Sequence, residues 1–233
     1  MKVLVTSGGT VIKIDSVRKI CNMSKGTFGS KIGQHFIKFL LENNKDELTF
    51  LHAKDSKLPP YFGNDNYEKH IHNRMKTVEY VTFDDYAKEL DNCLKDQPDI
   101  IVLAAAVSDY GIENPIDGKI RSGDDLVIRL KPLPKLISTV REKCPKAVIC
   151  GFKLLVNSTE DELKNAVENS LIKNKCDLVV GNDLRDIKNN SHQLLIGESI
   201  DDFGHFKPTF DLYGKEFDLA KVVVDRCYQC FNL

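Results

Sequence analysis

The chain has no long apolar run and no excess of one charge. No stretch approaches the roughly 20 consecutive apolar residues that a membrane span requires. Its 33 Lys and Arg residues are balanced by 34 Asp and Glu residues. A balanced chain has no overall field with which to hold a nucleic acid or an anionic membrane surface. We therefore expect no nucleic-acid partner and no membrane partner, and any site for an anion must be local.

The sequence also lacks a disulfide framework and a secretory signal. It has seven cysteines, an odd number, scattered through segments with strand or helix patterns. The N-terminus goes directly into a strand pattern without the apolar length of a signal peptide. These features are typical of a reducing compartment, so the sequence predicts a cytoplasmic location. Cys227 and Cys230 stand alone as a close pair within a helix pattern, which favours core packing over zinc binding.

Two nucleotide-binding fingerprints are missing. The glycines behind the first strand are Gly8 and Gly9, and the next one, Gly26, lies far downstream. The GxGxxG pattern of dinucleotide-binding proteins is therefore absent, and so is the P-loop pattern GxxxxGK followed by Ser or Thr. An ordinary NAD-binding or P-loop site is disfavoured.

Strand and helix patterns alternate along the chain, which is typical of an α/β fold with a mostly parallel sheet and helices on both faces. With 233 residues and 42% apolar content, the chain suits one such Rossmann-like domain over residues 1–233. The expected strands span residues 2–6, 48–53, 77–81, 100–106, 147–152 and 177–181, with edge strands or a hairpin at 192–197 and near 208. The expected helices span residues 29–43, 84–94, 134–143, 159–173 and 215–231.

Two segments interrupt this alternation. Residues 111–128 combine proline and glycines with charged residues and predict an ordered flap or hairpin, with a short strand at 126–128. Residues 54–75 contain a Pro-Pro pair and several Asn and His residues, and predict a mobile loop.

The most informative segment lies directly behind the first strand. We call residues 17–29 the cradle segment; it places Arg18, Asn22, Ser24 and Gly26 ahead of the first predicted helix. The first N–H groups of a helix have no partner within it, and the helix dipole adds partial positive charge there. Arg18 can hold a second anionic group with its bidentate guanidinium. The segment therefore predicts a site for a phosphorylated substrate.

Polar residues also follow the later strands. Ligands of an open α/β sheet bind outside the carboxyl ends of the strands. Residues 8–10, 108–109, 152–153 and 182–183 occupy those ends, so we expect them to converge on one crevice. Four lysines near predicted loops and helix ends carry charge that suits a triphosphate with a divalent cation, although most lysines simply lie in solvent. They are Lys119, Lys135, Lys153 and Lys173.

Eight separated segments together resemble one family, the phosphopantothenate cysteine ligases of coenzyme A biosynthesis, and especially their short single-function bacterial form. The segments occur in family order over about four fifths of the chain. They are VTSGGT at 5–10, IDSVR at 14–18, NMSKG at 22–26, AVSDY at 106–110, GKI at 118–120, PKLI at 134–137, GFKL at 151–154 and LIKNKCDLVVGND at 171–183.

The resemblance implies a reaction that joins the carboxylate of 4'-phosphopantothenate to the amine of L-cysteine. CTP activates the carboxylate as an acyl cytidylate with release of pyrophosphate, and cysteine then displaces CMP. The family needs Mg²⁺, which spreads the charge of the phosphates. It is homodimeric, with sites that take residues from both subunits. Because the flavin decarboxylase part of fused members is missing from this sequence, we expect no FMN and a separate phosphopantothenoylcysteine decarboxylase as partner.

The resemblance also implies roles for individual residues. Asn22 holds the pantothenate chain and the acyl cytidylate, Arg18 supports that loop and the acyl centre, and Ser24 and Gly26 cap the substrate phosphate. Lys119 is the flap lysine that closes over the reacting phosphoryl group. Asp109 orients the cytidine ribose or its cation, and no other protein ligand for the metal is expected. The remaining nucleotide-binding residues are Gly8, Gly9, Thr10, Leu103, Ala104, Ala105, Pro134, Lys135, Leu136, Ile137, Phe152 and Lys173, the last meeting the triphosphate.

The chain departs from the family at two positions. Ile12 stands where many bacterial relatives have a glutamate, and Asn169 replaces a phosphate-facing lysine, for which Lys164 or Lys175 would have to substitute.

Two other functions stay open at this point. A non-catalytic nucleotide or pantothenate binding module is one. An NAD(P)-dependent reductase is the other, although the second strand ends in His52-Ala53-Lys54 without an acidic residue. The choice between CTP and ATP also stays open.

Overall fold

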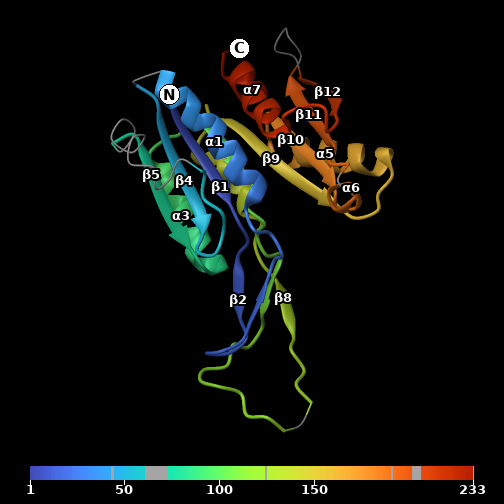
Figure 1. The fold of residues 1–233 in the computed structure, drawn as a ribbon. Helices are drawn as coiled ribbons and strands as arrows, with labels where there is room; N and C mark the ends of the chain where they lie inside the picture. The colour runs from blue at the N-terminus through green and yellow to red at the C-terminus, as the bar shows by residue number, and fades with distance from the viewer. Residues whose placement is uncertain (43–44, 61–72, 124, 190, 201–205, 233) are drawn as a thin grey trace.

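The structure is a computed structural model that describes residues 1–42, 45–60, 73–123, 125–189, 191–200 and 206–232. In this part of the chain, an eight-stranded sheet has the order β12-β11-β10-β9-β6-β1-β4-β5 (Figure 1). Its strands are parallel except β11 and β12, which add an antiparallel hairpin at one edge. The strands are β1 (Lys2–Ser7), β4 (Glu47–Ala53), β5 (Met75–Tyr80), β6 (Ile100–Leu103), β9 (Val148–Leu155), β10 (Leu178–Asp183), β11 (Leu194–Ile200) and β12 (Phe206–Tyr213).

Helices cover both faces of the sheet. Alternate residues of β1 serve the two sides: Val3 and Val5 pack with α1 and α7, whereas Leu4 packs with α3, α4 and α5. Strands covered on both faces read as continuous apolar runs, which is why the central strands could be recognised. The predicted α/β class is confirmed. The helices are α1 (Thr27–Glu42), α3 (Phe83–Lys95), the 3₁₀ helix η1 (Leu136–Thr139), α4 (Val140–Lys143), α5 (Glu160–Asn174), α6 (Leu184–Lys188) and α7 (Leu219–Phe231).

Two short hairpins form an arm that extends from the sheet (Figure 1). One hairpin pairs β2 (Val11–Lys13) with β3 (Lys19–Cys21), and the other pairs β7 (Tyr110–Ile112) with β8 (Leu130–Pro132). The first hairpin was not predicted, because two three-residue strands show no apolar periodicity. The second is the predicted flap, but its returning strand lies at residues 130–132 and not at 126–128. Leu126 and Val127 remain exposed, so that apolar run does not mark a paired strand.

Other boundaries also differ from the predictions. The first helix begins at Thr27, so Gly29 lies inside it, and the strand expected at 100–106 ends at Leu103. The helix expected at 134–143 is a 3₁₀ turn followed by four α-helical residues. The loop expected at 54–75 lies partly outside the described residues, and Met75 already belongs to β5. The helix expected at 159–173 is α5, which begins at a capping box formed by Thr159 and Glu162.

No helix among the described residues is long and apolar enough to span a bilayer. The single domain expected over residues 1–233 stays a prediction.

Candidate active site

The cradle segment packs directly on the end of β1. Ser7 Oγ donates a hydrogen bond of 3.1 Å to the carbonyl of Gly26, whose φ is +70°. A Cβ on Gly26 would lie 2.7 Å from Ser7 Oγ, and one on Gly29 would lie 2.4 Å from the same atom. Only glycine lets α1 begin this close to the strand. The positive end of α1, with no acidic residue in its first turn, is therefore fixed at the carboxyl edge of the sheet.

Asn22 connects the cradle segment to the loop after β6. Its Nδ2 donates to the carbonyl of Ala106 at 2.6 Å. Gly9 forms a parallel bridge with Ala106, and a Cβ on Gly9 would lie 3.1 Å from Asn22 Cβ. The structure thus brings together three predicted parts of the site: the glycine loop, the amide and the loop that follows β6.

Hydroxyl groups fasten the same two loops to each other. Thr10 Oγ1 and Ser108 Oγ lie 2.9 Å apart, and the Ser108 N–H donates to Thr10 Oγ1 at 2.9 Å. Thr6 Oγ1 accepts from the N–H of Ala105 at 3.1 Å. Both threonine side chains are fully buried, so Thr10 shapes the loop with its hydroxyl, and its predicted contact with a nucleotide stays a prediction.

An aromatic contact joins the cradle segment to β9. The rings of Phe28, in the first turn of α1, and Phe152 lie edge to face with centroids 6.1 Å apart. The ring of His192, after α6, also lies edge to face with the ring of Phe28, with centroids 5.5 Å apart. Burial and then the nearby Lys31 lower the pKa of His192, and its Nε2 is buried without a hydrogen-bond partner among the described residues.

The predicted nucleotide-binding residues of the second half come partly together. Lys135 Nζ donates to a carboxylate oxygen of Asp109, and both side chains are exposed. Ile137, in η1, lies under β9: a Cβ on Gly151 would be 3.1 Å from Ile137 Cδ1. Pro134 is exposed, and Leu136 is half-buried beside the cluster that includes Leu103. Leu103 ends β6 at the same edge, and Ala104 and Ala105 follow it.

The two hairpins of the arm are held together by Asp15. Its carboxylate accepts from the guanidinium of Arg18 at 2.5 Å and from the N–H of Ile120 at 3.1 Å. Burial alone would raise the pKa of Asp15, but hydrogen bonds from the backbones of Val17, Ile120 and Arg18 and from the Arg18 side chain outweigh it and lower the pKa to about 2. Arg18 thus forms an ion pair within its own hairpin. Its roles in supporting the loop of the site and at the acyl centre stay predictions.

Lys119 and Ser24 are both exposed and free to approach a ligand. Lys119 follows Gly118, whose carbonyl accepts from the N–H of Ser16 at 2.9 Å. The lysine therefore lies on the arm, where the two hairpins meet. Ser24 Oγ accepts from the N–H of Gly26 at 3.4 Å, so the two residues predicted to bind the substrate phosphate are neighbours in space. Their predicted roles are not tested by this arrangement alone.

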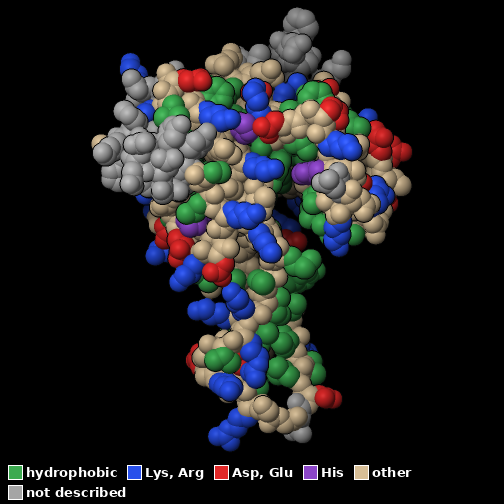
Figure 2. Space-filling view, viewed as in Figure 1, with side chains coloured by type: hydrophobic (Ala, Val, Ile, Leu, Met, Phe, Trp, Pro, Cys, Tyr) green, Lys and Arg blue, Asp and Glu red, His purple; other side chains and the backbone are tan. Residues whose placement is uncertain are grey.

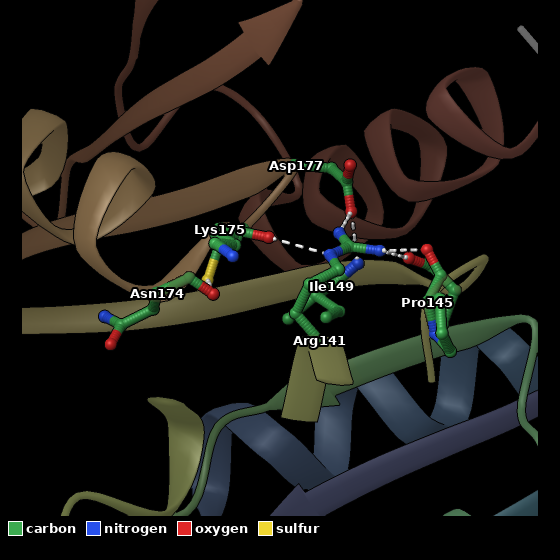
Figure 3. A network of polar contacts seen from close by, with 8 residues as sticks. Arg141, Pro145, Ile149, Asn174, Lys175 and Asp177 are labelled. Atoms are coloured by element: carbon green, nitrogen blue, oxygen red, sulfur yellow. Dashed lines mark hydrogen bonds and ion pairs between the residues drawn. The ribbon is translucent and has the colours of Figure 1, made fainter. Parts of the chain in front are cut away.

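Lys173 is separated from the other predicted residues. It lies in the last turn of α5, which leads to the start of β10, whereas the rest of the site lies where the strands end. Figure 3 shows the neighbouring contacts at this opposite edge: Arg141 donates to the carbonyl of Lys175 at 3.0 Å and to Asp177 at 2.6 Å. Within one chain, the structure does not place Lys173 beside the cradle segment.

Asp183 is also committed elsewhere. Its carboxylate accepts from the N–H groups of Asn157, Ser158 and Arg185 and from the Ser158 hydroxyl, at 2.7 to 3.1 Å. The Ser158 N–H is the largest cause that lowers its pKa to about 2. Asp183 thus joins the loop before α5 to the start of α6, and with Asn182 it belongs to β10 itself. We expected the Asp183 side chain to point into the crevice shared by the strand ends. It is bound to these other groups instead.

The described residues contain no group of three or more His, Cys, Asp and Glu side chains that could hold a metal ion. Asp109 is the predicted protein ligand, and Lys135 neutralises it here. Mg²⁺ usually keeps several waters and binds through one or two carboxylates plus substrate phosphates. The donor set therefore fits an ion held mainly by a triphosphate, with at most one carboxylate from this chain.

Three residues of this region were not predicted. Phe28 lies within the cradle segment but received no role, although an aromatic residue at the start of a helix is a usable signal. Ser7 lies in the segment VTSGGT but received no role, and His192 shows no signal in the sequence. The importance of each depends on a residue far away along the chain, Gly26 for Ser7 and Phe28 for His192.

Comparisons with known proteins identify the family of the chain. The family described as DNA/pantothenate metabolism flavoprotein C-terminal domain matches residues 1–39 and 63–201. The coenzyme A biosynthesis bifunctional protein CoaBC of Thermococcus kodakarensis is 33% identical over 196 residues, which cover 84% of this chain and 44% of that protein. The chain thus spans less than half the length of the curated relatives that it matches.

Solved structures show the same fold. A DNA/pantothenate metabolism flavoprotein from Streptococcus pneumoniae is 29% identical with a TM-score of 0.78, covering 98% of this chain and 99% of its own. A mutant of Cab2 in complex with phosphopantothenate-cysteine has the same TM-score at 22% identity, covering 99% of this chain and 86% of its own; at this identity the likeness is one of fold. On the extent of the sequence match, the chain belongs to the DNA/pantothenate metabolism flavoprotein C-terminal domain family.

Proposed function

We propose that this chain is a phosphopantothenate cysteine ligase, which forms 4'-phosphopantothenoyl-L-cysteine from 4'-phosphopantothenate, L-cysteine and CTP. The observation that carries the proposal is the junction between the cradle segment and the later strands. Asn22 donates to Ala106 at 2.6 Å and Phe28 meets Phe152 at 6.1 Å, so a phosphate held by the cradle would lie beside a nucleotide held by the later strands. A reaction between two phosphorylated substrates requires that proximity.

The proposed chemistry has two steps. The carboxylate of phosphopantothenate attacks the α-phosphorus of CTP, forms the acyl cytidylate and releases pyrophosphate. The amine of cysteine then attacks the acyl carbon, loses a proton and displaces CMP, so that an amide bond forms. A free carboxylate is a poor acylating agent, which is why a nucleotide is consumed. The protein contributes mainly positioning and neutralisation of charge.

Each group of residues has a part in this proposal. The N-terminus of α1 with Ser24 and Gly26 binds the phosphate of phosphopantothenate. Asn22 orients the pantothenate chain and the acyl group, because it is already fixed by Ala106. Lys119, exposed on the arm, neutralises charge on the phosphates during activation. Mg²⁺, held by the triphosphate, supplies Lewis-acid neutralisation when it is bound.

A second copy of the chain is part of the proposal. The arm exposes large apolar side chains, with Val127 80% and Val17 63% exposed, which is unusual for a surface that faces only water. We propose that two copies pair through their arms. The exposed Lys119 of each copy would then lie beside the other copy. The mass in solution, measured by light scattering, tests this part: a monomer at all concentrations contradicts it.

The nucleotide and the setting complete the proposal. CTP is favoured by the resemblance, and competition between CTP and ATP in the same assay decides the preference. The seven cysteines are all free, which supports a reducing compartment such as the cytoplasm, where a phosphopantothenoylcysteine decarboxylase would use the product. A reductase is disfavoured because the GxGxxG pattern is absent behind β1, and because β4 ends in His52 and Ala53 without the acidic residue that holds the ribose of NAD.

The test is release of pyrophosphate by the purified chain. We expect release only when phosphopantothenate, CTP and Mg²⁺ are all present. Addition of cysteine should then convert the intermediate to product and CMP, which mass spectrometry detects. Nucleotide binding without pyrophosphate release would indicate a binding module. A nicotinamide titration serves as the control for the reductase, and tight binding of NADPH would contradict the ligase assignment.

A further inference from the structure

The first 41 residues carry a charge unlike that of the rest of the chain. They contain seven Lys or Arg residues and one acidic residue, whereas residues 42–233 contain 26 basic and 33 acidic residues. The one acidic residue, Asp15, is buried and bound to Arg18. A chain with a net charge of −1 therefore holds a strongly positive N-terminal part, which is the part that forms the cradle segment and α1.

Four exposed lysines from this part and its neighbour form what we call the lysine row: Lys25, Lys31, Lys38 and Lys57. The N–H of Lys57 donates to the carbonyl of Lys25 at 3.0 Å, so these two backbones are adjacent. Lys31 and Lys38 are seven residues apart in α1, hence on one face and about 10 Å apart along the helix. Within the described residues, none of the four forms an ion pair, whereas Lys19 lies 3.5 Å from Asp55 and is left out of the row.

The row leads to the mouth of the candidate site. Lys25 directly precedes Gly26, and Lys31 is close enough to His192, beside Phe28, to affect its protonation. Figure 2 shows Lys and Arg side chains following one another over α1 and down toward the arm, with a hollow beside them that faces the part formed by α5 and α6. Charge that lines the approach to a hollow focuses the field there.

We propose that the lysine row attracts the anionic substrates toward the cradle segment from a distance, and that Lys31, Lys38 and Lys57 do not touch them once they are bound. This inference rests on the proposed function, because both proposed phosphorylated substrates are polyanions: a phosphate monoester carries about −1.5 to −2 charges at pH 7, and a triphosphate carries more. A cleft lined by charges of one sign raises the association rate of an oppositely charged ligand by about 10-fold to 10³-fold, and the gain disappears as salt screens the field.

The experiment compares two matched double variants. Lys31→Glu with Lys38→Glu reverses the row on α1; Lys88→Glu with Lys95→Glu makes the same change at the same seven-residue spacing on α3, which covers the other face of the sheet. Association of a fluorescent mant derivative of CTP is followed by stopped flow between 10 mM and 1 M salt, where the Debye length falls from about 30 to about 3 Å. The kcat at saturating substrate is measured in parallel, and thermal melts check folding.

We expect the row variant to associate about 10-fold more slowly than the wild type at 10 mM salt and less than about 2-fold more slowly at 1 M, with kcat unchanged. The α3 variant should match the wild type throughout. Equal rates for all three proteins, an equal loss in both variants, or a fall in kcat of the row variant would overturn the inference. If the wild type binds mant-CTP with this salt dependence but releases no pyrophosphate, the ligase proposal fails and the inference stands. If the wild type does not bind mant-CTP at all, both fail.

Discussion

Arg141 offers the sharpest test of how the sheet is held together at its amino edge. Its side chain, 19% exposed, donates to the carbonyls of Lys175, Pro145 and Ala147 at 3.0, 3.1 and 2.7 Å and to Asp177 at 2.6 Å (Figure 3). Asp177 in turn accepts from the N–H of Ile149 at 2.7 Å. The guanidinium thus ties the turns that precede β9 and β10 into one unit.

The loss of stability in Arg141→Ala depends on whether water can replace the guanidinium at each of its four acceptors. Pro145 and Lys175 are exposed, so water can replace the lost donor there. Ala147 is buried and Asp177 is only 23% exposed, so these two oxygens lose a donor that water replaces poorly. Loss of the donor to the Ala147 carbonyl and of the charged donor to Asp177, which keeps the hydrogen bond from the Ile149 N–H, costs about 2–3 kcal/mol in the free energy of unfolding. For a chain of this size, that corresponds to a fall in Tm of about 5–10 °C.

Urea and thermal unfolding measure this effect. Lys146→Ala, an exposed residue of the same turn, is the matched control and should change the free energy of unfolding by less than about 0.5 kcal/mol. Arg141→Lys should recover less than half of the loss, because one ammonium group cannot reach four acceptors. If the Tm of Arg141→Ala falls no further than that of the control, the guanidinium does not hold the turns together and the reasoning is refuted.

Three further outcomes are expected. Asn22→Asp should still release pyrophosphate but form product about 10²-fold more slowly, since a carboxylate loses the bond to Ala106 and repels the phosphates; unimpaired product formation would contradict its role. Lys119→Gln should lower the rate of pyrophosphate release by about 10²-fold and leave Tm within about 2 °C, because the exposed side chain stabilises nothing in the core; parallel losses of both would mark it as structural. The pKa of Asp15 and Asp183 is lowered from 3.8 to about 2 in the folded state, so each stabilises the fold above about pH 4 and loses that contribution as the pH falls toward 2. The urea concentration at the midpoint of unfolding should therefore decrease as the pH is lowered below 4, and it should decrease less in Asp15→Asn. Identical pH profiles for the variant and the wild type would refute this account.

The sheet could be predicted because its evidence is local. The central strands are continuous apolar runs, and α5 begins at a capping box that can be seen in four residues. The helix expected at 134–143 failed for an equally local reason. The hydroxyls of Ser138 and Thr139 donate to the carbonyls three residues earlier, at 2.6 and 3.0 Å, which favours the tighter 3₁₀ turn.

The arrangement of the site could be predicted only in part. That the cradle segment faces the later strands followed from the rule for open α/β sheets, and the Asn22–Ala106 contact agrees with it. The commitment of Asp183 to the Ser158 loop, and the position of Lys173 at the amino edge, depend on where α5 begins and ends relative to β10. Sequence patterns placed both ends of α5 within one residue but ended the strand at 181, two residues before the end of β10, and the residue types alone suggested ligand binding.

The shared use of Asp15 by both hairpins has a consequence for how the arm responds to ligands. The N–H groups of Arg18 and Ile120, which are more than 100 positions apart, end on the same carboxylate. Neither hairpin can open without releasing the other, so their amides should exchange with deuterium as one cooperative unit. An event that steadies one of them, whether a substrate near Asn22 or a second copy against Val127, thereby steadies both.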